Sequence, residues 1–166
     1  MKTKLKGCLV LIDLQKGFIN DNKEIIKNIK SLLNKYEFEH IVATKFINEP
    51  NSPYFKLLNY KEMTETDKNT DLDPFIKKIS NKIITKNLYS CFNEDFNTYL
   101  KTNNIEKLYF AGMDSEACVL KSVFDCFEKN IDFKIFTNCC KSNNGKNLEN
   151  ATEEIIKIIA GEDKLI

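Results

Sequence analysis

Short apolar stretches recur along the chain, and longer segments with helical character follow them. Five stretches are rich in β-branched and aromatic residues and have the length of buried strands. They are Gly7–Ile12, His40–Thr44, Lys82–Thr85, Lys107–Ala111 and Asp132–Phe136. The carboxyl-terminal residues Lys164–Ile166 are a candidate for a short sixth strand at the edge of the sheet.

Segments between these strands predict helices. In the first of them, Ile25, Ile29 and Leu32 recur at the spacing of one buried helix face. Further along, Asp73-Pro74 is typical of a helix N-cap followed by proline at the first helical position. The predicted helices are Lys23–Tyr36, Pro74–Ile79, Glu94–Thr102, Ser115–Lys129 and Leu148–Ile159.

Regular alternation of strand and helix predicts an α/β protein with three layers, α-β-α, around a central parallel sheet of five or six strands. We expect one domain over residues 1–166, because no repeat, low-complexity block or second domain is evident. A connection at Leu14–Asn22 and a polar loop at Asn138–Lys146 are expected. Gly112 is expected to break the strand before it.

Charge and composition restrict the partners. All 25 basic residues are Lys, and 24 acidic residues are interspersed with them. Without Arg there is no bidentate fork for phosphates or base edges, so we expect no nucleic-acid partner. The first apolar run is about six residues long, too short for a secretory core or a membrane span. We therefore predict a cytoplasmic protein without a membrane partner, with its six cysteines reduced.

Three reactive side chains follow three of the predicted strands. Asp13, Lys86 and Cys118 each lie at or just beyond a strand end, and in an open α/β sheet such residues converge on one crevice. A carboxylate, an ammonium and a thiol together are the equipment of an activated cysteine nucleophile. Cys118 is expected in the first turn of a helix, where the helix dipole would stabilise its thiolate, and the Lys86 ammonium would favour the thiolate as well.

Each of these residues also has a plainer interpretation. A free cysteine is often a buried structural residue, an aspartate after a strand often forms a turn, and a lysine there often meets solvent. Only the combination at three strand ends favours chemistry.

Three sequence motifs resemble those of the isochorismatase-like cysteine hydrolases, which include nicotinamidases and N-carbamoylsarcosine amidohydrolases. VLIDLQKGF resembles the opening motif hydrophobic-D-x-Q-x-x-F, and ITKNLYSCF resembles the second motif, with its lysine. GMDSEACV resembles G-x-x-T-D-x-C-V, with Ser115 and Glu116 in place of Thr and Asp. The similarity spans roughly residues 7–142.

That resemblance implies the strand order 3-2-1-4-5-6 and a role for each residue. Cys118 would be the nucleophile, Asp13 the acid and base, and Lys86 the third catalytic member. A cis peptide bond is implied at Met113–Asp114, aiming the Asp114 N–H, beside that of Cys118, at the oxyanion. Assembly as a homo-oligomer is expected on the same ground.

A zinc site is not expected. Nicotinamidases bind zinc through an Asp-x-His-x-x-x-His pattern after the second strand, where this chain has ATKFINEPNSPYF. Its one histidine, His40, stands at the start of that predicted strand, ahead of the segment where the pattern would lie. We predict no metal and no cofactor.

The leading hypothesis is a metal-independent cysteine hydrolase acting on a small amide or carbamoyl compound through a thioester. Phe18, Phe46, Tyr89 and Phe92 are candidate pocket walls, with core packing as the equal alternative. Two other classes stay open: a non-catalytic binding module on the same fold, and a redox-responsive thiol protein with Cys91 as resolving cysteine. The variable loops leave the substrate itself unnamed.

Overall fold

A five-stranded parallel sheet forms the centre of the molecule. The computed structural model describes residues 1–20 and 22–166, so position 21 of the predicted Leu14–Asn22 connection lies outside the described residues. The strand order is β3-β2-β1-β4-β5, and every neighbouring pair is parallel. This confirms the predicted fold class and the order of the first five strands. The strands are β1 (Thr3–Ile12), β2 (Tyr36–Phe46), β3 (Lys82–Lys86), β4 (Lys107–Met113) and β5 (Asp132–Lys141).

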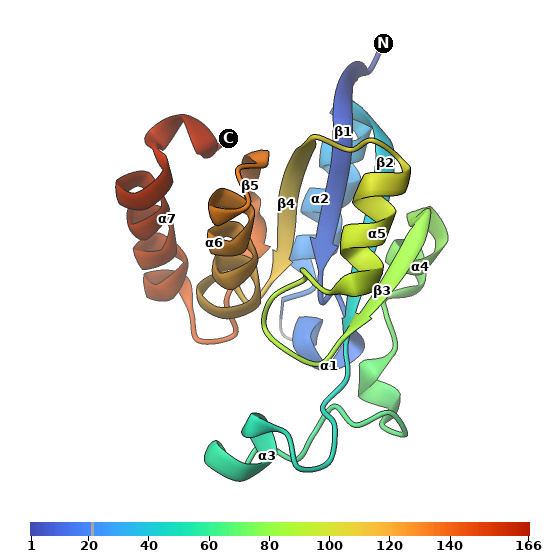
Figure 1. Cartoon of the computed structure of the whole chain (residues 1–166), viewed down its shortest axis with the longest axis vertical. Helices are drawn as coiled ribbons and strands as arrows, with labels where there is room; N and C mark the ends of the chain where they lie inside the picture. Colours follow the sequence, from blue (N-terminus) through green and yellow to red (C-terminus); the bar gives the residue numbers. More distant parts are fainter. Residues whose placement is uncertain (21) are drawn as a thin grey trace.

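Helices cover both faces of the sheet. In Figure 1, α5 and α6 lie in front of the strands and α2 lies behind them. The carboxyl ends of the strands point downward in that view, toward α1 and α3. The helices are α1 (Lys16–Ile19), α2 (Glu24–Lys35), α3 (Pro53–Leu57), α4 (Pro74–Ile79), α5 (Glu94–Thr102), α6 (Leu120–Glu128) and α7 (Lys146–Ala160).

Two hydrophobic cores follow from the alternation of side chains along the strands. In β1, Val10 points into the core shared with α5, α6 and α7, whereas Leu9 and Leu11 point into the core shared with α2 and α4. All three side chains are fully buried. Burial on both faces explains why the strand is a continuous apolar run.

Helix starts agree closely with the sequence. The Asp73 carboxylate accepts a hydrogen bond from the Phe75 N–H at 2.8 Å, with Pro74 at the first helical position. Likewise, Asn93 accepts from the Phe96 N–H at 2.9 Å at the start of α5. Both caps satisfy amides that have no partner inside their helix.

All five strands run further than predicted, and the carboxyl ends of β4 and β5 differ with the most consequence for the site. β4 continues through Gly112 to Met113, where Cys140 and Lys141 of β5 pair with it, so the expected loop from Asn138 begins only after Lys141. Gly112 is required rather than disruptive: its φ is +142°, and a Cβ there would lie 2.2 Å from the Ile12 carbonyl oxygen. Close approach of β1 and β4 therefore explains why glycine stands within the strand.

The carboxyl-terminal tail does not form a sixth strand of the described sheet. Leu165 makes an isolated parallel bridge to Ile135, and Ile166 exchanges backbone hydrogen bonds with Ile135 and Thr137. The tail thus runs briefly along the free edge of β5, over too few residues to become a strand.

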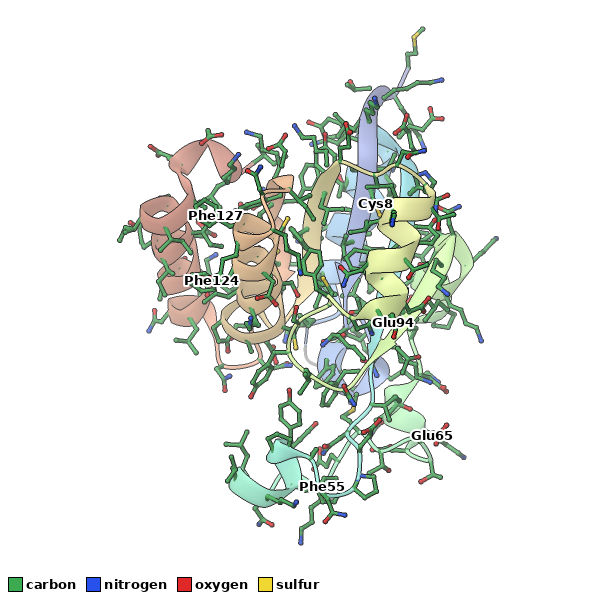
Figure 2. The ribbon with its side chains drawn as sticks, in the orientation of Figure 1. Cys8, Phe55, Glu65, Glu94, Phe124 and Phe127 are labelled. Carbon is green, nitrogen blue, oxygen red and sulfur yellow. The ribbon has the colours of Figure 1, made fainter. Side chains whose placement is uncertain are left out.

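An arm between β2 and β3 carries α3 away from the sheet, beyond the strand carboxyl ends (Figure 1). Phe55 lies on this arm in Figure 2. Asn48 fixes its base: the buried side-chain amide donates to the Tyr60 and Glu62 carbonyls at 2.9 and 3.0 Å and accepts from the Ser52 hydroxyl at 2.6 Å. In the described part of the chain, no helix is both long and apolar enough to cross a membrane.

Candidate active site

Asp13 follows β1 directly, in a backbone conformation that few residues adopt. Its φ is +50°, in the left-handed region. Thr44, near the end of β2, holds it from two sides: the Asp13 N–H donates to the Thr44 hydroxyl at 3.0 Å, and that hydroxyl donates to Asp13 Oδ1 at 2.5 Å. This arrangement leaves Oδ2 free to face Lys86.

Lys86 is the last residue of β3, and its ammonium lies between the other two candidates. Nζ is 2.7 Å from Asp13 Oδ2 and 3.4 Å from Cys118 Sγ. It also donates to the Leu88 and Tyr89 carbonyls at 2.9 and 3.2 Å. Since the Asp13 and Lys86 side chains are each only 1% exposed, this is a buried ion pair whose charges are compensated by specific partners.

Cys118 lies on a π-helical turn, Ser115–Val119, between β4 and α6. The Ala117 and Val119 amides both donate to the Asp114 carbonyl at 3.1 Å, which fixes this wide turn. The backbone carbonyl of Cys118 accepts a hydrogen bond from the Ser122 hydroxyl at 2.7 Å. Single π-turns of this kind occur often at functional sites.

The charges of the three groups are coupled. Burial raises the pKa of the Cys118 thiol well above its usual value; the Asp13 carboxylate raises it further, and Lys86 opposes this. For Lys86, burial lowers the pKa, but Asp13 and Cys118 outweigh it and leave the pKa raised. The raised Cys118 pKa favours a neutral thiol beside the ammonium. Lys86 lowers the Cys118 pKa, as the sequence predicts, but desolvation and the Asp13 carboxylate outweigh it, so the expected net stabilisation of the thiolate is not found.

A cavity of about 570 Å³ opens above Cys118 and Asp13. Phe18, Phe46 and Tyr89 line it, as three of the four predicted walls. Phe92 does not share this position. It packs against Phe96 at a ring-centroid distance of 5.3 Å and lines a separate groove beside Leu88. The reason is that Phe92 precedes α5 closely and turns back toward the helix.

Several residues of the site were not identified from the sequence. Thr44 could have been found as a polar residue at the end of a buried strand. Gln15 stands in the opening motif: its amide donates to the Phe46 and Thr70 carbonyls at 2.8 and 2.9 Å and accepts from the Phe46 N–H at 2.7 Å. Glu116 stands in the third motif but was not identified as a cavity residue. No local pattern marks the cavity residues that come from the arm and from the loop after β5, which are Tyr54, Leu58, Tyr60, Asn143 and Asn144.

Comparison with known proteins identifies the family. The family model described as isochorismatase domain matches residues 7–161. The chain belongs to the isochorismatase-like hydrolases. No curated protein sequence matches it.

Solved structures share the fold at low sequence identity. An isochorismatase-like hydrolase from Alkaliphilus metalliredigens superposes with a TM-score of 0.82 at 16% identity, over 97% of this chain and 94% of that one. A nicotinamidase from Bacillus subtilis gives 0.79 at 20% identity, over 96% and 98%. An N-carbamoylsarcosine amidase from Thermoplasma acidophilum gives 0.70 at 16% identity, over 95% and 94%.

One expectation taken from the isochorismatase-like hydrolases is wrong for this structure. None of the described residues has a cis peptide bond, so Met113–Asp114 is trans. Trans is the default for a bond without proline, since cis costs about 3–4 kcal/mol. Asp114 instead adopts an extended conformation that ends β4 and begins the turn carrying Cys118.

This isochorismatase-like chain lacks the donors of a two-histidine zinc site. His40 lies in β2, and its Nδ1 is 3.1 Å from the Tyr99 hydroxyl on α5. Its side chain therefore takes part in the packing of α5 against the sheet. The described residues contain no group of three or more His, Cys, Asp or Glu that could hold a metal ion. A nicotinamidase-type zinc site does not fit these residues.

Cys91, the candidate resolving cysteine, has the character of a core residue. It is fully buried, and burial raises its pKa to about 12. Its N–H donates to the Ser122 hydroxyl at 3.0 Å. A thiol of this kind is a poor partner for redox exchange, because exchange requires an accessible thiolate.

Proposed function

We propose that this protein is a cysteine hydrolase that cleaves the C–N bond of a small amide or carbamoyl compound through a thioester on Cys118, without a metal. The observation that carries the proposal is the contact of a thiol, a carboxylate and an ammonium at the base of one cavity. Membership of the isochorismatase-like hydrolases, and the fold shared with a nicotinamidase and an N-carbamoylsarcosine amidase, support it.

Acylation begins from the neutral thiol. Cys118 Sγ attacks the carbonyl carbon while its proton passes to the Asp13 carboxylate; the Lys86 ammonium contacts both groups, at 3.4 Å from Sγ and 2.7 Å from Asp13 Oδ2. The carbonyl becomes an oxyanion, for which we assign the backbone amide of Cys118 in the turn as a donor; the trans Met113–Asp114 bond removes the ground on which the Asp114 N–H was expected beside it. Asp13 then gives the proton to the departing nitrogen, the C–N bond breaks, and the acyl group stays on sulfur as a thioester.

Deacylation uses the same carboxylate. Asp13 takes a proton from a water molecule as the water oxygen attacks the thioester carbonyl. Collapse of this second intermediate breaks the C–S bond, and the proton returns to sulfur. The balance is one amide and one water consumed, with one carboxylic acid and one ammonia or amine produced.

Lys86 acts through Asp13 in this scheme. Its ammonium stabilises the carboxylate at 2.7 Å and holds it in the crevice while the proton moves. The two backbone carbonyls that Lys86 also binds fix the loop carrying Tyr89 at the cavity wall. The positions of base, nucleophile and wall therefore depend on one side chain.

The first test is a screen of small amides, ureas and carbamates for ammonia release, repeated with hydroxylamine present. A thioester transfers its acyl group to hydroxylamine, giving a hydroxamate and the free thiol. We expect at least one compound to release ammonia and to yield hydroxamate at the expense of acid. Hydrolysis without any hydroxamate, or no hydrolysis across the screen, would contradict the proposal. The second result would favour the binding-module alternative.

A further inference from the structure

The charged groups that line the catalytic cavity are all acidic. They are Asp13, Asp114 and Glu116, and none of the described lining residues is Lys or His. The chain has no Arg. The ammonium of Lys86 lies beneath the cavity, where it is already engaged by Asp13, Cys118 and two carbonyls. A ligand that enters this cavity therefore meets carboxylates, and among the described lining residues it meets no positively charged side chain.

Glu116 is fixed in place but only half satisfied. Its Oε1 accepts from the Ser142 hydroxyl and from the Asn144 side-chain amide, each at 2.8 Å. Its Oε2 is shielded from solvent and has no hydrogen-bond partner among the described residues. A buried carboxylate oxygen without a partner costs free energy, so the position favours a donor supplied from outside the chain.

Asp114 adds a second carboxylate next to the first. Its Oδ1 accepts from the Asn143 N–H at 2.8 Å. Burial raises the pKa of Asp114 to about 6, the Asn143 hydrogen bond opposes the rise, and Glu116 adds to it. A cation bound between the two carboxylates would relieve their mutual repulsion.

Aromatic rings supply a large part of the remaining cavity lining. Tyr54 packs edge-on against Phe46 and Tyr89, with ring centroids 5.1 Å apart in both pairs. All three line the cavity, together with Phe18 and Tyr60. Aromatic faces attract ammonium groups, and the attraction grows when water is excluded. Carboxylates and aromatic rings in one cavity form a site for an organic cation.

We propose that the cavity selects small amides that carry a positively charged group, such as an ammonium, and rejects amides that carry a carboxylate. This inference rests on the proposed function, because it assigns a substrate class to the same site. The cation would lie against Glu116 and Asp114 with the aromatic rings around it, and the amide carbonyl would reach Cys118.

Charge selection can be measured on Cys118 without knowing the substrate. Three methanethiosulfonates with similar head groups label thiols as disulfides: the 2-(trimethylammonio)ethyl, the 3,3-dimethylbutyl and the 2-sulfonatoethyl compounds. Each labelling rate is divided by the rate for 2-mercaptoethanol, and peptide mass spectrometry with Cys118→Ala as reference assigns the label. We expect the cationic reagent to label Cys118 about tenfold or more faster than the anionic one.

Two isosteric variants connect this preference to the acidic groups. Glu116→Gln and Asp114→Asn each keep the oxygen that accepts the internal hydrogen bonds, and each should reduce the preference severalfold. Glu128→Gln removes the same charge at the last residue of α6, the end of that helix away from Cys118, and should leave the preference unchanged. Equal labelling by all three reagents, faster anionic labelling, or no label on Cys118 would overturn the inference.

Turnover with matched amides separates the inference from the proposed function. The compounds are 3-(trimethylammonio)propanamide, its neutral isostere 4,4-dimethylpentanamide, and succinamate. We expect kcat/KM to be highest for the cation and lowest for the anion. Cys118-dependent hydrolysis that prefers the neutral or anionic amide overturns charge selection and supports the proposed function. Hydrolysis that is unchanged in Cys118→Ala overturns the proposed function, even if the labelling preference stands.

Discussion

At the scale of single residues, the site is organised around Asp13. Its carboxylate contacts Thr44 and Lys86 at once, Lys86 in turn contacts Cys118, and the left-handed backbone conformation of Asp13 makes this possible. Backbone strain at a buried polar residue persists only where the surroundings hold it, and such residues cluster at functional sites.

Asp13→Asn should have two opposite effects. Amide turnover should fall by about 10²–10⁴-fold, since an amide cannot shuttle the proton. The pKa of Cys118 should fall at the same time, because the Asp13 carboxylate is one of the causes that raise it. The pH dependence of Cys118 alkylation by iodoacetamide measures this shift. Asp71→Asn is the matched control, because it makes the same substitution at an exposed aspartate that pairs with Lys16. A Cys118 pKa that stays unchanged or rises would show that Asp13 does not act on the thiol.

Thr44 is predicted to be a positioning residue. Thr44→Val removes the hydroxyl that joins the backbone and the carboxylate of Asp13, so kcat should fall about tenfold with little change in KM. Loss of the buried hydrogen bonds should also lower the free energy of unfolding by about 1–3 kcal/mol. Thr44→Ser keeps the hydroxyl and should restore kcat. A Thr44→Ser variant as impaired as Thr44→Val would show that the methyl packing matters instead.

At the scale of elements, the existence of the strands and the positions of the helix caps were the features best predicted from the sequence. Asp73-Pro74 predicted α4 at its observed bounds, because a cap is decided by two adjacent residues. The ends of β4 and β5 were misjudged, because Gly112 and Asn138 are local breakers that strand pairing overrides. Pairing joins residues distant in the sequence, so no local pattern announces it.

The junction of β1 and β4 offers a test at this scale. Gly112→Ala would place a Cβ against the Ile12 carbonyl at a φ of +142°, and we expect overpacking to cost about 1–3 kcal/mol in urea denaturation on top of the backbone strain. Gly145→Ala has a similar positive φ, +100°, but its Cβ would meet nothing within 4 Å. It should cost only the backbone strain, about 1–3 kcal/mol. Equal losses would mean that close strand approach at Gly112 is unimportant.

At the scale of the whole molecule, the fold brings together what the sequence could only place at separate strand ends. Strand order is what brings Asp13, Lys86 and Cys118 together. Three apolar runs, each ending at a reactive residue, were enough to predict that they converge, whereas the order itself came from the resemblance of the three motifs to the isochorismatase-like hydrolases. The cavity was much less predictable. Tyr54 and Glu116 belong to an arm and a turn whose positions depend on tertiary packing.

Assembly remains a prediction from family resemblance. We expect a homo-oligomer, and light scattering over a wide concentration range measures it directly. A mass equal to one chain at every concentration would contradict this expectation.

The most direct test of the account is the turnover of Cys118→Ala on an amide that the wild-type enzyme hydrolyses. Removing Sγ should abolish hydrolysis while the circular dichroism spectrum and the urea midpoint stay close to wild type, because the side chain is small. Cys126→Ala, on α6 in the same hydrophobic core, is the matched control and should keep its activity. Turnover by Cys118→Ala at the wild-type rate would mean that the chemistry lies elsewhere.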